Sequence, residues 1–203
     1  MTTILGIAGS LRSGSYNAAL LRALVELAPA PARIETASIR GIPIYDGDVE
    51  AGSGIPEPVR ELKERIASCD ALLLVTPEYN NSLPGPFKNA IDWLSRPPAD
   101  IPRVFGNRAA ALCGTTLGPG GTNLAQIAWL PVLRALGVRP WFGRILGVPS
   151  ANKAFDESGA LIDEKLRERA RAFIAGFAEF AAGSQAPRSG ARSEPKASGV
   201  EKV

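Results

Sequence analysis

One short polar segment of the chain carries the residue types that bind phosphate in α/β proteins. Gly9–Asn17 follows an apolar run and contains three serines, one arginine and two glycines. A loop of this kind at the start of a helix offers unpaired backbone N–H groups and a partial positive charge, to which a dianion binds. The segment lacks the glycine spacing of dinucleotide-binding and ATP-binding loops. It therefore favours the terminal phosphate of a mononucleotide, although a plain polar turn stays open as an alternative.

Side chains for acid–base and nucleophilic catalysis are scarce in the rest of the chain. There is no histidine, which excludes Ser-His-Asp triads, Cys-His pairs and imidazole metal ligands. Cys69 and Cys113 lie within apolar patterns, so we expect two small core residues and no disulfide or metal site. Such a composition suits a reaction that a bound cofactor performs while the protein supplies position and electrostatics.

The overall composition predicts one globular domain. The chain has 203 residues, 45% of them hydrophobic, and a formal net charge of +3. We expect neither a membrane span nor a signal peptide, and hence a cytoplasmic protein, because no apolar stretch is long enough and the N-terminus has no basic region. Nucleic-acid binding is not expected either, because no dense basic stripe with interleaved aromatic residues is present.

Apolar periodicity predicts the elements that position the polar loops. Five expected strands are Ile4–Ala8, Arg33–Ser38, Ala71–Thr76, Ala109–Cys113 and Trp141–Val148. Five segments with helical spacing follow them: Leu20–Ala28, Val59–Cys69, Phe87–Leu94, Leu124–Leu136 and Leu166–Phe177. The alternation predicts a doubly wound, mostly parallel sheet, in which ligands bind outside the carboxyl ends of the strands. The polar or glycine-rich loops after the first, third and fourth strands should meet there.

Two further segments have distinct predictions. The connection from Ile39 to Pro56 is expected to have no secondary structure of its own, with Asp46 and Asp48 as turn formers or interface residues. From Ser184 to Val203 the chain is rich in Ser, Pro, Gly and charged residues, so we expect a disordered tail after a domain of residues 1–183.

The segment Pro77–Trp93, PEYNNSLPGPFKNAIDW, strongly resembles the NAD(P)H-dependent FMN reductase family of the flavodoxin-like fold, which includes quinone, chromate and azo-dye reductases. Gly9–Asn17 is similar to the FMN phosphate loop of this family, and Ile42–Asp46 is similar to another of its motifs. The resemblance covers about Met1 to Ala182. It implies a five-stranded parallel sheet with strand order 2-1-3-4-5 and FMN as a non-covalent cofactor.

The resemblance also assigns site residues. Those that it places at FMN are Ser10, Arg12, Ser15, Tyr16, Asn17, Pro77, Glu78, Tyr79, Asn80, Gly114 and Thr115. The first five belong to the phosphate loop, and the next four lie at the edge and face of the isoalloxazine ring, largely through backbone groups. The region Gly114–Gly121 approaches the other side of the ring. No side chain is expected to be catalytic, because the flavin carries the hydride.

The implied activity is transfer of hydride from NAD(P)H through FMN to a quinone, a flavin or a similar small acceptor, in a ping-pong cycle. A dimer or tetramer with the flavin near a subunit boundary is also implied. One alternative is a flavodoxin-like electron carrier for a protein partner, which a sequence pI of about 9.1 disfavours because such carriers are usually acidic. The other is a nucleotide-binding module without catalysis, which the run Glu78–Asp92 disfavours.

Three pairs of residues have predictions outside the motif roles. Lys88 and Asp92 are spaced as an exposed helix pair. Trp93 and Trp129 are expected in the core or at a subunit contact. Surface roles are expected for the arginines near the last strand, Arg139 and Arg144, with contact to the phosphate of a nicotinamide nucleotide as the alternative.

Overall fold

The computed structural model describes residues 1–183 of the chain. Its parallel sheet has the order β2-β1-β3-β4-β5, and a sixth short strand, β6, pairs with β4 beyond β5. The strands are β1 (Thr3–Ala8), β2 (Arg33–Ser38), β3 (Ala71–Val75), β4 (Ala109–Thr115), β5 (Arg139–Pro140) and β6 (Leu146–Val148). The predicted flavodoxin-like strand order is confirmed.

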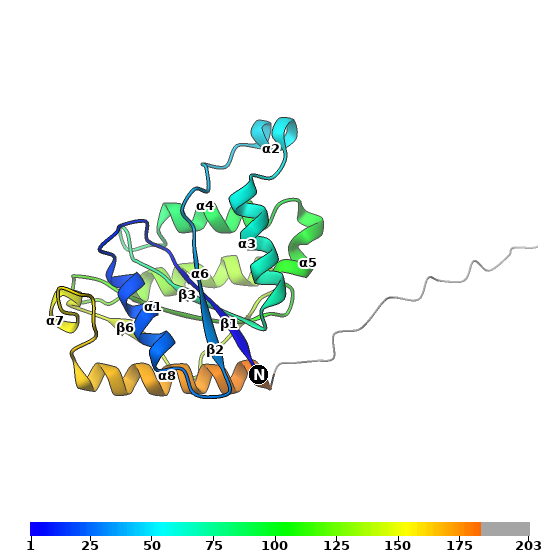
Figure 1. Ribbon diagram of the computed structural model, residues 1–203. Helices are drawn as coiled ribbons and strands as arrows, with labels where there is room; N and C mark the ends of the chain where they lie inside the picture. Colours follow the sequence, from blue (N-terminus) through cyan, green and yellow to red (C-terminus); the bar gives the residue numbers. More distant parts are fainter. Residues whose placement is uncertain (184–203) are drawn as a thin grey trace, which may run out of the picture.

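Helices cover both faces of the sheet, as the continuous apolar strands require (Figure 1). In β3, Leu73 packs into the core shared with α1 and α8, whereas Leu72 and Leu74 pack into the opposite core. One face is covered by α1 (Tyr16–Glu26) and α8 (Glu164–Ala182), the other by α3 (Glu57–Ser68), α4 (Gly85–Leu94) and α6 (Asn123–Ala135). All five predicted helices are therefore present, and their packing brings the loops at the carboxyl ends of the strands together.

The prediction of a single fifth strand over Trp141–Val148 is wrong in its bounds. In this part of the chain, only β5 and β6 pair with β4. The N–H of Trp141 still donates to the Ala110 carbonyl of β4 at 2.8 Å, and the chain leaves the sheet after it. The indole ring of Trp141 packs against Phe173 and Phe177 of α8, at centroid distances of 5.2 and 5.7 Å. The chain returns to β4 at Leu146, and Phe142 is exposed.

The connection after β2 contains a helix that the sequence did not predict. Helix α2 (Gly47–Ser53) projects from the top of the molecule in Figure 1, and none of its residues is buried. Asp46 forms its N-cap by accepting a hydrogen bond from the Asp48 N–H at 2.8 Å, which confirms the prediction of a turn former. We call residues 42–56 the α2 arm. Three shorter helices were also not predicted: η1 (Pro98–Asp100), α5 (Ile101–Val104) and α7 (Ala151–Ala154).

The remaining residue predictions concern the core and the surface. Trp93 and Trp129 are fully buried, so they are core residues and contribute no surface for a subunit contact. Cys69 and Cys113 are buried free thiols, and burial raises the pKa of both. Lys88 and Asp92 form the expected helix pair, at 2.6 Å.

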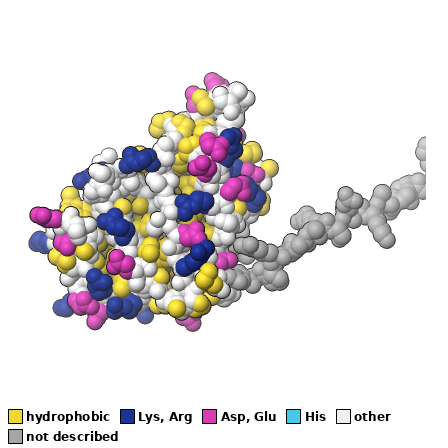
Figure 2. All heavy atoms as spheres, viewed as in Figure 1, with side chains coloured by type: hydrophobic (Ala, Val, Ile, Leu, Met, Phe, Trp, Pro, Cys, Tyr) yellow, Lys and Arg dark blue, Asp and Glu magenta, His cyan; other side chains and the backbone are white. Residues whose placement is uncertain are grey.

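Charged side chains of both signs are interspersed on the face shown in Figure 2. Within residues 1–183, no helix has the length and apolar character to cross a membrane. The predicted tail, residues 184–203, lies outside the described part of the chain.

Candidate functional site

The loops after β1, β3 and β4 meet at the carboxyl ends of the strands (Figure 1). A polar hollow lies between these loops. We call it the sheet-end pocket. Its volume is about 170 Å³. Its lining residues are Ser10, Arg12, Ser15, Tyr16, Asn17, Pro77, Glu78, Tyr79, Thr115, Thr116 and Leu117. The tertiary structure thus brings three loops far apart in sequence to one place.

All of the site residues assigned from the sequence line this pocket except Asn80 and Gly114. Two lining residues, Thr116 and Leu117, were assigned only as part of the region Gly114–Gly121. Because β4 ends at Thr115, these two continue directly from the strand into the pocket wall. Most residues of the sequence-based assignment therefore lie in the pocket wall. The structure separates them from Asn80 and Gly114, which support the wall without lining it.

The first loop presents hydrogen-bond donors to the pocket. The Ser15 hydroxyl caps α1 by accepting a hydrogen bond from the Ala18 N–H at 3.2 Å, whereas the backbone N–H groups of Tyr16 and Asn17 make no hydrogen bond within residues 1–183. The Arg12 side chain is exposed and has no ion-pair or hydrogen-bond partner in this part of the chain. Arg40 holds the loop from outside by donating to the Leu11 carbonyl at 2.6 Å. Donors and a cation that have no partner within residues 1–183 are the groups with which helix N-termini bind anions in other proteins.

Asn17 fixes the first loop to the fourth strand. Its side-chain amide donates to the Thr115 carbonyl and accepts from the Thr115 N–H, both at 3.0 Å, and it is buried. The Thr115 hydroxyl in turn donates to the Val148 carbonyl of β6 at 3.0 Å. The Asn17 side chain is therefore engaged in holding α1 against β4, and its backbone N–H is the group left for a ligand.

The loop after β3 contains a tight hairpin turn. Tyr79 and Ser82 exchange two backbone hydrogen bonds, at 3.1 and 3.0 Å. The two residues between them, Asn80 and Asn81, have positive φ angles of 50° and 59°, as a type I′ turn requires and as asparagine tolerates. Asn80 thus shapes the turn without lining the pocket, while Tyr79 stands at the rim with 44% of its surface exposed.

Glu78 has a structural role that the sequence gave no means of finding. Its carboxylate accepts a hydrogen bond from the Ala125 N–H at 3.0 Å. Ala125 lies in the first turn of α6, where the N-cap residue Thr122 makes no side-chain capping bond. Glu78 therefore caps α6 from another loop and fastens the loop after β3 to that helix. The two partners are 47 residues apart, so no local pattern marks them.

Two glycines permit close packing around the pocket. A Cβ atom at Gly114 would collide with the carbonyl of Thr76, the residue after β3, and one at Gly9 would collide with the ring of Phe87. Glycine at such positions can serve either a turn with a positive φ angle or a close approach of neighbouring elements. Neither has a positive φ angle, and both instead let neighbouring elements approach closely.

The α2 arm is anchored next to this end of the molecule. Tyr45 donates its N–H to the Asn89 side chain at 2.8 Å, and its ring packs edge-on against Trp93 at 4.9 Å. The side chains of Asn89 and Trp93 both donate to the Pro43 carbonyl, at 2.8 and 2.9 Å. The base of the arm is therefore fixed to α4, which follows the loop after β3 in the chain.

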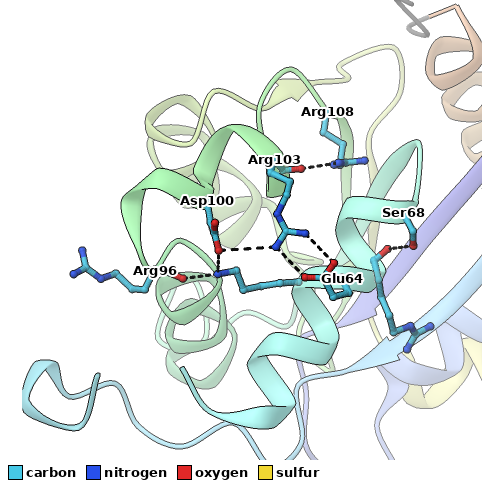
Figure 3. A network of polar contacts seen from close by, with 8 residues as sticks. Glu64, Ser68, Arg96, Asp100, Arg103 and Arg108 are labelled. Atoms are coloured by element: carbon cyan, nitrogen blue, oxygen red, sulfur yellow. Dashed lines mark hydrogen bonds and ion pairs between the residues drawn. The ribbon is translucent and has the colours of Figure 1, made fainter. Parts of the chain in front are cut away.

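A charge network extends from the arm into the body. Glu50 accepts hydrogen bonds from Arg96 at 2.8 Å and from the Tyr45 hydroxyl at 2.9 Å. The bond from Arg96 lowers the pKa of Glu50, and the bond to Glu50 raises the pKa of Tyr45. Figure 3 shows the continuation, in which the buried Lys63 donates to the Arg96 carbonyl and pairs with Asp100. The arm is thus coupled to α3 and to the segment after α4.

Comparisons with known proteins identify what this arrangement is similar to. Residues 2–153 match the family described as NADPH-dependent FMN reductase. An NAD(P)H-dependent FMN reductase of Pseudomonas aeruginosa is 47% identical over 165 residues, covering 81% of this chain and 87% of the relative. A 2-hydroxy-1,4-benzoquinone reductase of a Burkholderia species is 36% identical over 174 residues, covering 86% and 93%.

A solved structure agrees with this assignment. The flavoenzyme FerB, an NAD(P)H:(acceptor) oxidoreductase of Paracoccus denitrificans, superimposes with a TM-score of 0.81 at 33% identity, covering 91% of this chain and 99% of that one. The fold, the sequence matches and the position of the sheet-end pocket all agree with one family. The chain belongs to the NADPH-dependent FMN reductase family, a family of oxidoreductases that use FMN and NAD(P)H.

Proposed function

We propose that this protein binds FMN non-covalently in the sheet-end pocket and uses it to reduce a quinone, a flavin or a similar small acceptor at the expense of NAD(P)H. The observation that carries the proposal is the meeting of a donor-rich helix N-terminus with the loops after β3 and β4 at one hollow. The names of the relatives, an FMN reductase and a benzoquinone reductase, support this substrate class.

The first loop fits the phosphate of FMN. The free N–H groups of Tyr16 and Asn17 stand at the positive end of α1, and the serine hydroxyls at positions 10 and 15 border the same space. Arg12 supplies one cation that has no partner in the described part of the chain. A dianion placed there would satisfy donors that the protein leaves unpaired.

The rest of the pocket fits a flat ring that stays partly open to solvent. About 170 Å³ is less than the roughly 300–1,000 Å³ of sites that enclose a small molecule, so a ligand of the size of FMN extends over the rim. Tyr79 stands at that rim on the β3 side, and Thr115 to Leu117 form the β4 side. An open ring face leaves room for a second planar molecule.

The chemistry of the lining supports cofactor-centred transfer. When bound, FMN accepts a hydride from NAD(P)H and passes two electrons on. Glu78, the carboxylate in the pocket lining, is already engaged with α6, and the chain has no histidine. The residues of this chain therefore bind and orient, and the open face receives donor and acceptor one after the other, as a ping-pong cycle requires.

We also propose that the protein self-associates through the α2 arm and that residues 1–183 suffice for FMN binding. Ile44 and Val49 of the arm are 80% and 42% exposed. A seven-residue helix is marginal in water unless it packs against other groups, and none of the residues of α2 is buried by the rest of residues 1–183. A second copy that covers the arm would supply that packing. Sedimentation velocity tests this, because Ile44→Glu should shift the protein toward monomer.

The test of the central proposal is a titration with FMN. The protein should perturb the visible spectrum of FMN, and excess FMN should raise the melting temperature by mass action. Initial rates with NADPH and a benzoquinone should then give parallel double-reciprocal lines. If excess FMN changes neither the spectrum nor the melting temperature, the proposal is lost, and intersecting lines would replace the ping-pong cycle with a ternary complex.

A further inference from the structure

A buried threonine stands directly before the loop that contacts the proposed flavin. Thr76 follows β3 and is fully buried. Its hydroxyl donates to the Pro77 carbonyl at 2.8 Å and accepts a hydrogen bond from the indole N–H of Trp129 at 3.0 Å. Trp129 lies on α6 and is also fully buried. The threonine hydroxyl is therefore fixed from both sides.

This short chain of hydrogen bonds sets the orientation of the Pro77–Glu78 peptide. The Pro77 carbonyl points to the Thr76 hydroxyl. That hydroxyl lies on the side of α6, because it is bonded to Trp129 of this helix. The peptide is trans, so the Glu78 N–H points in the opposite direction. That N–H makes no hydrogen bond within the described residues, and both Pro77 and Glu78 line the sheet-end pocket. The Glu78 N–H is therefore available to a ligand in the pocket as a hydrogen-bond donor.

The carboxylate of Glu78 holds the same peptide from its other end. It caps α6 through the Ala125 N–H at 3.0 Å, so Glu78 is tied to the helix that also carries Trp129. A peptide rotated by half a turn would lose the bond to Thr76 and would present the Pro77 carbonyl to the pocket. A carbonyl acceptor would then stand where an N–H donor stands now, and it would face the acceptor nitrogen and oxygen atoms at the edge of the isoalloxazine ring.

We propose that Thr76 is a positioning residue for the flavin, and that Trp129 positions Thr76. The hydroxyl of Thr76 keeps the Glu78 N–H directed at the ring, where it favours the reduced, more negatively charged form of the cofactor. This inference rests on the proposed function, that FMN binds in the sheet-end pocket. Neither residue lines the pocket, so their effect is transmitted through the loop after β3.

The experiment compares Thr76→Val with Thr76→Ser, since valine keeps the shape of threonine and removes the hydroxyl, whereas serine keeps the hydroxyl. Affinities for FMN and for riboflavin are measured by fluorescence titration, and the midpoint potential of the bound flavin by spectroelectrochemistry. Thr76→Val should lose about two- to tenfold in affinity for both flavins, the range expected for one hydrogen bond. Its midpoint potential should become more negative, and Thr76→Ser should remain near the wild type.

Trp129→Phe provides an independent variant, because it removes the donor that orients the Thr76 hydroxyl and keeps an aromatic ring in the core. It should shift the potential in the same direction by a smaller amount. Equal affinities and equal potentials for the wild type, Thr76→Val and Trp129→Phe would overturn the inference while leaving FMN binding intact. Absence of FMN binding by the wild type would instead overturn the proposed function together with the inference.

Discussion

The charge at position 12 is the part of the proposed site that a single substitution tests most directly. Arg12 is exposed and has no partner within residues 1–183, so Arg12→Ala removes a cation without breaking an internal contact. A hydrogen bond to a charged group contributes about 1.5–3 kcal/mol when shielded, and an exposed ion pair roughly 0.2–1 kcal/mol. Arg12 lines a pocket that is open to solvent, so we expect about 1–2 kcal/mol, a rise of roughly 5- to 30-fold in the Kd for FMN.

Riboflavin provides the internal comparison, because it has the same ring and no phosphate. Fluorescence titrations of both flavins at low salt should show that Arg12→Ala weakens FMN binding and leaves riboflavin binding unchanged. The difference should shrink as salt is added, since exposed charges are screened. Arg22→Ala is the matched control: it removes the same charge from an exposed residue of α1 that does not line the pocket. Equal losses for both flavins, or an equal effect of Arg22→Ala on FMN, would refute the assignment of Arg12 to the phosphate.

Three further predictions follow from the contacts around the site. Glu78→Ala should lower the free energy of unfolding by about 1 kcal/mol through loss of the cap on α6, and Glu78→Gln, which keeps an acceptor, should lose less; equal values in denaturant titrations would show that the cap is unimportant. Because Arg96 lowers the pKa of Glu50 in the folded state, the stabilisation is present above about pH 4.3 and is lost as the pH falls through the lower folded value. Acid titrations monitored by urea unfolding should therefore show a steeper loss for the wild type than for Glu50→Gln, and parallel curves would exclude this contribution. Removal of residues 184–203 should leave FMN affinity and NADPH oxidation unchanged, and loss of either would place that segment in the site.

Much of the fold could be predicted because its signals are local. The continuous apolar runs at Ile4–Ala8 and Ala71–Val75 identify buried parallel strands, and the alternation with helical spacing identifies the doubly wound arrangement. The fifth strand could not be delimited in this way. Its apolar residues fit a strand, but the chain leaves the sheet after Trp141, whose ring packs on α8.

The α2 arm illustrates a second limit of local reasoning. Its sequence from Gly47 to Ser53 has no apolar stripe, and a sequence of this kind predicts a loop. The helix forms because Asp46 caps its start and because Glu50 bonds to Arg96 and Tyr45. Arg96 is 46 residues away from Glu50, so the decisive contact is invisible in a short window of sequence.

For the site, the sequence by itself indicated which loops meet at the carboxyl ends of the strands, since polar or glycine-rich residues follow the first, third and fourth predicted strands. Only the tertiary structure decided which of those residues face the pocket and which support it. Asn17, Glu78 and Gly114 all serve contacts between elements remote in sequence: a bond to β4, a cap on α6 and a close approach to β3. The physical reason is that a residue can bind a ligand only through donors and acceptors that are not already hydrogen-bonded within the protein. In this fold, the partners that occupy those donors and acceptors come from segments far away in the sequence.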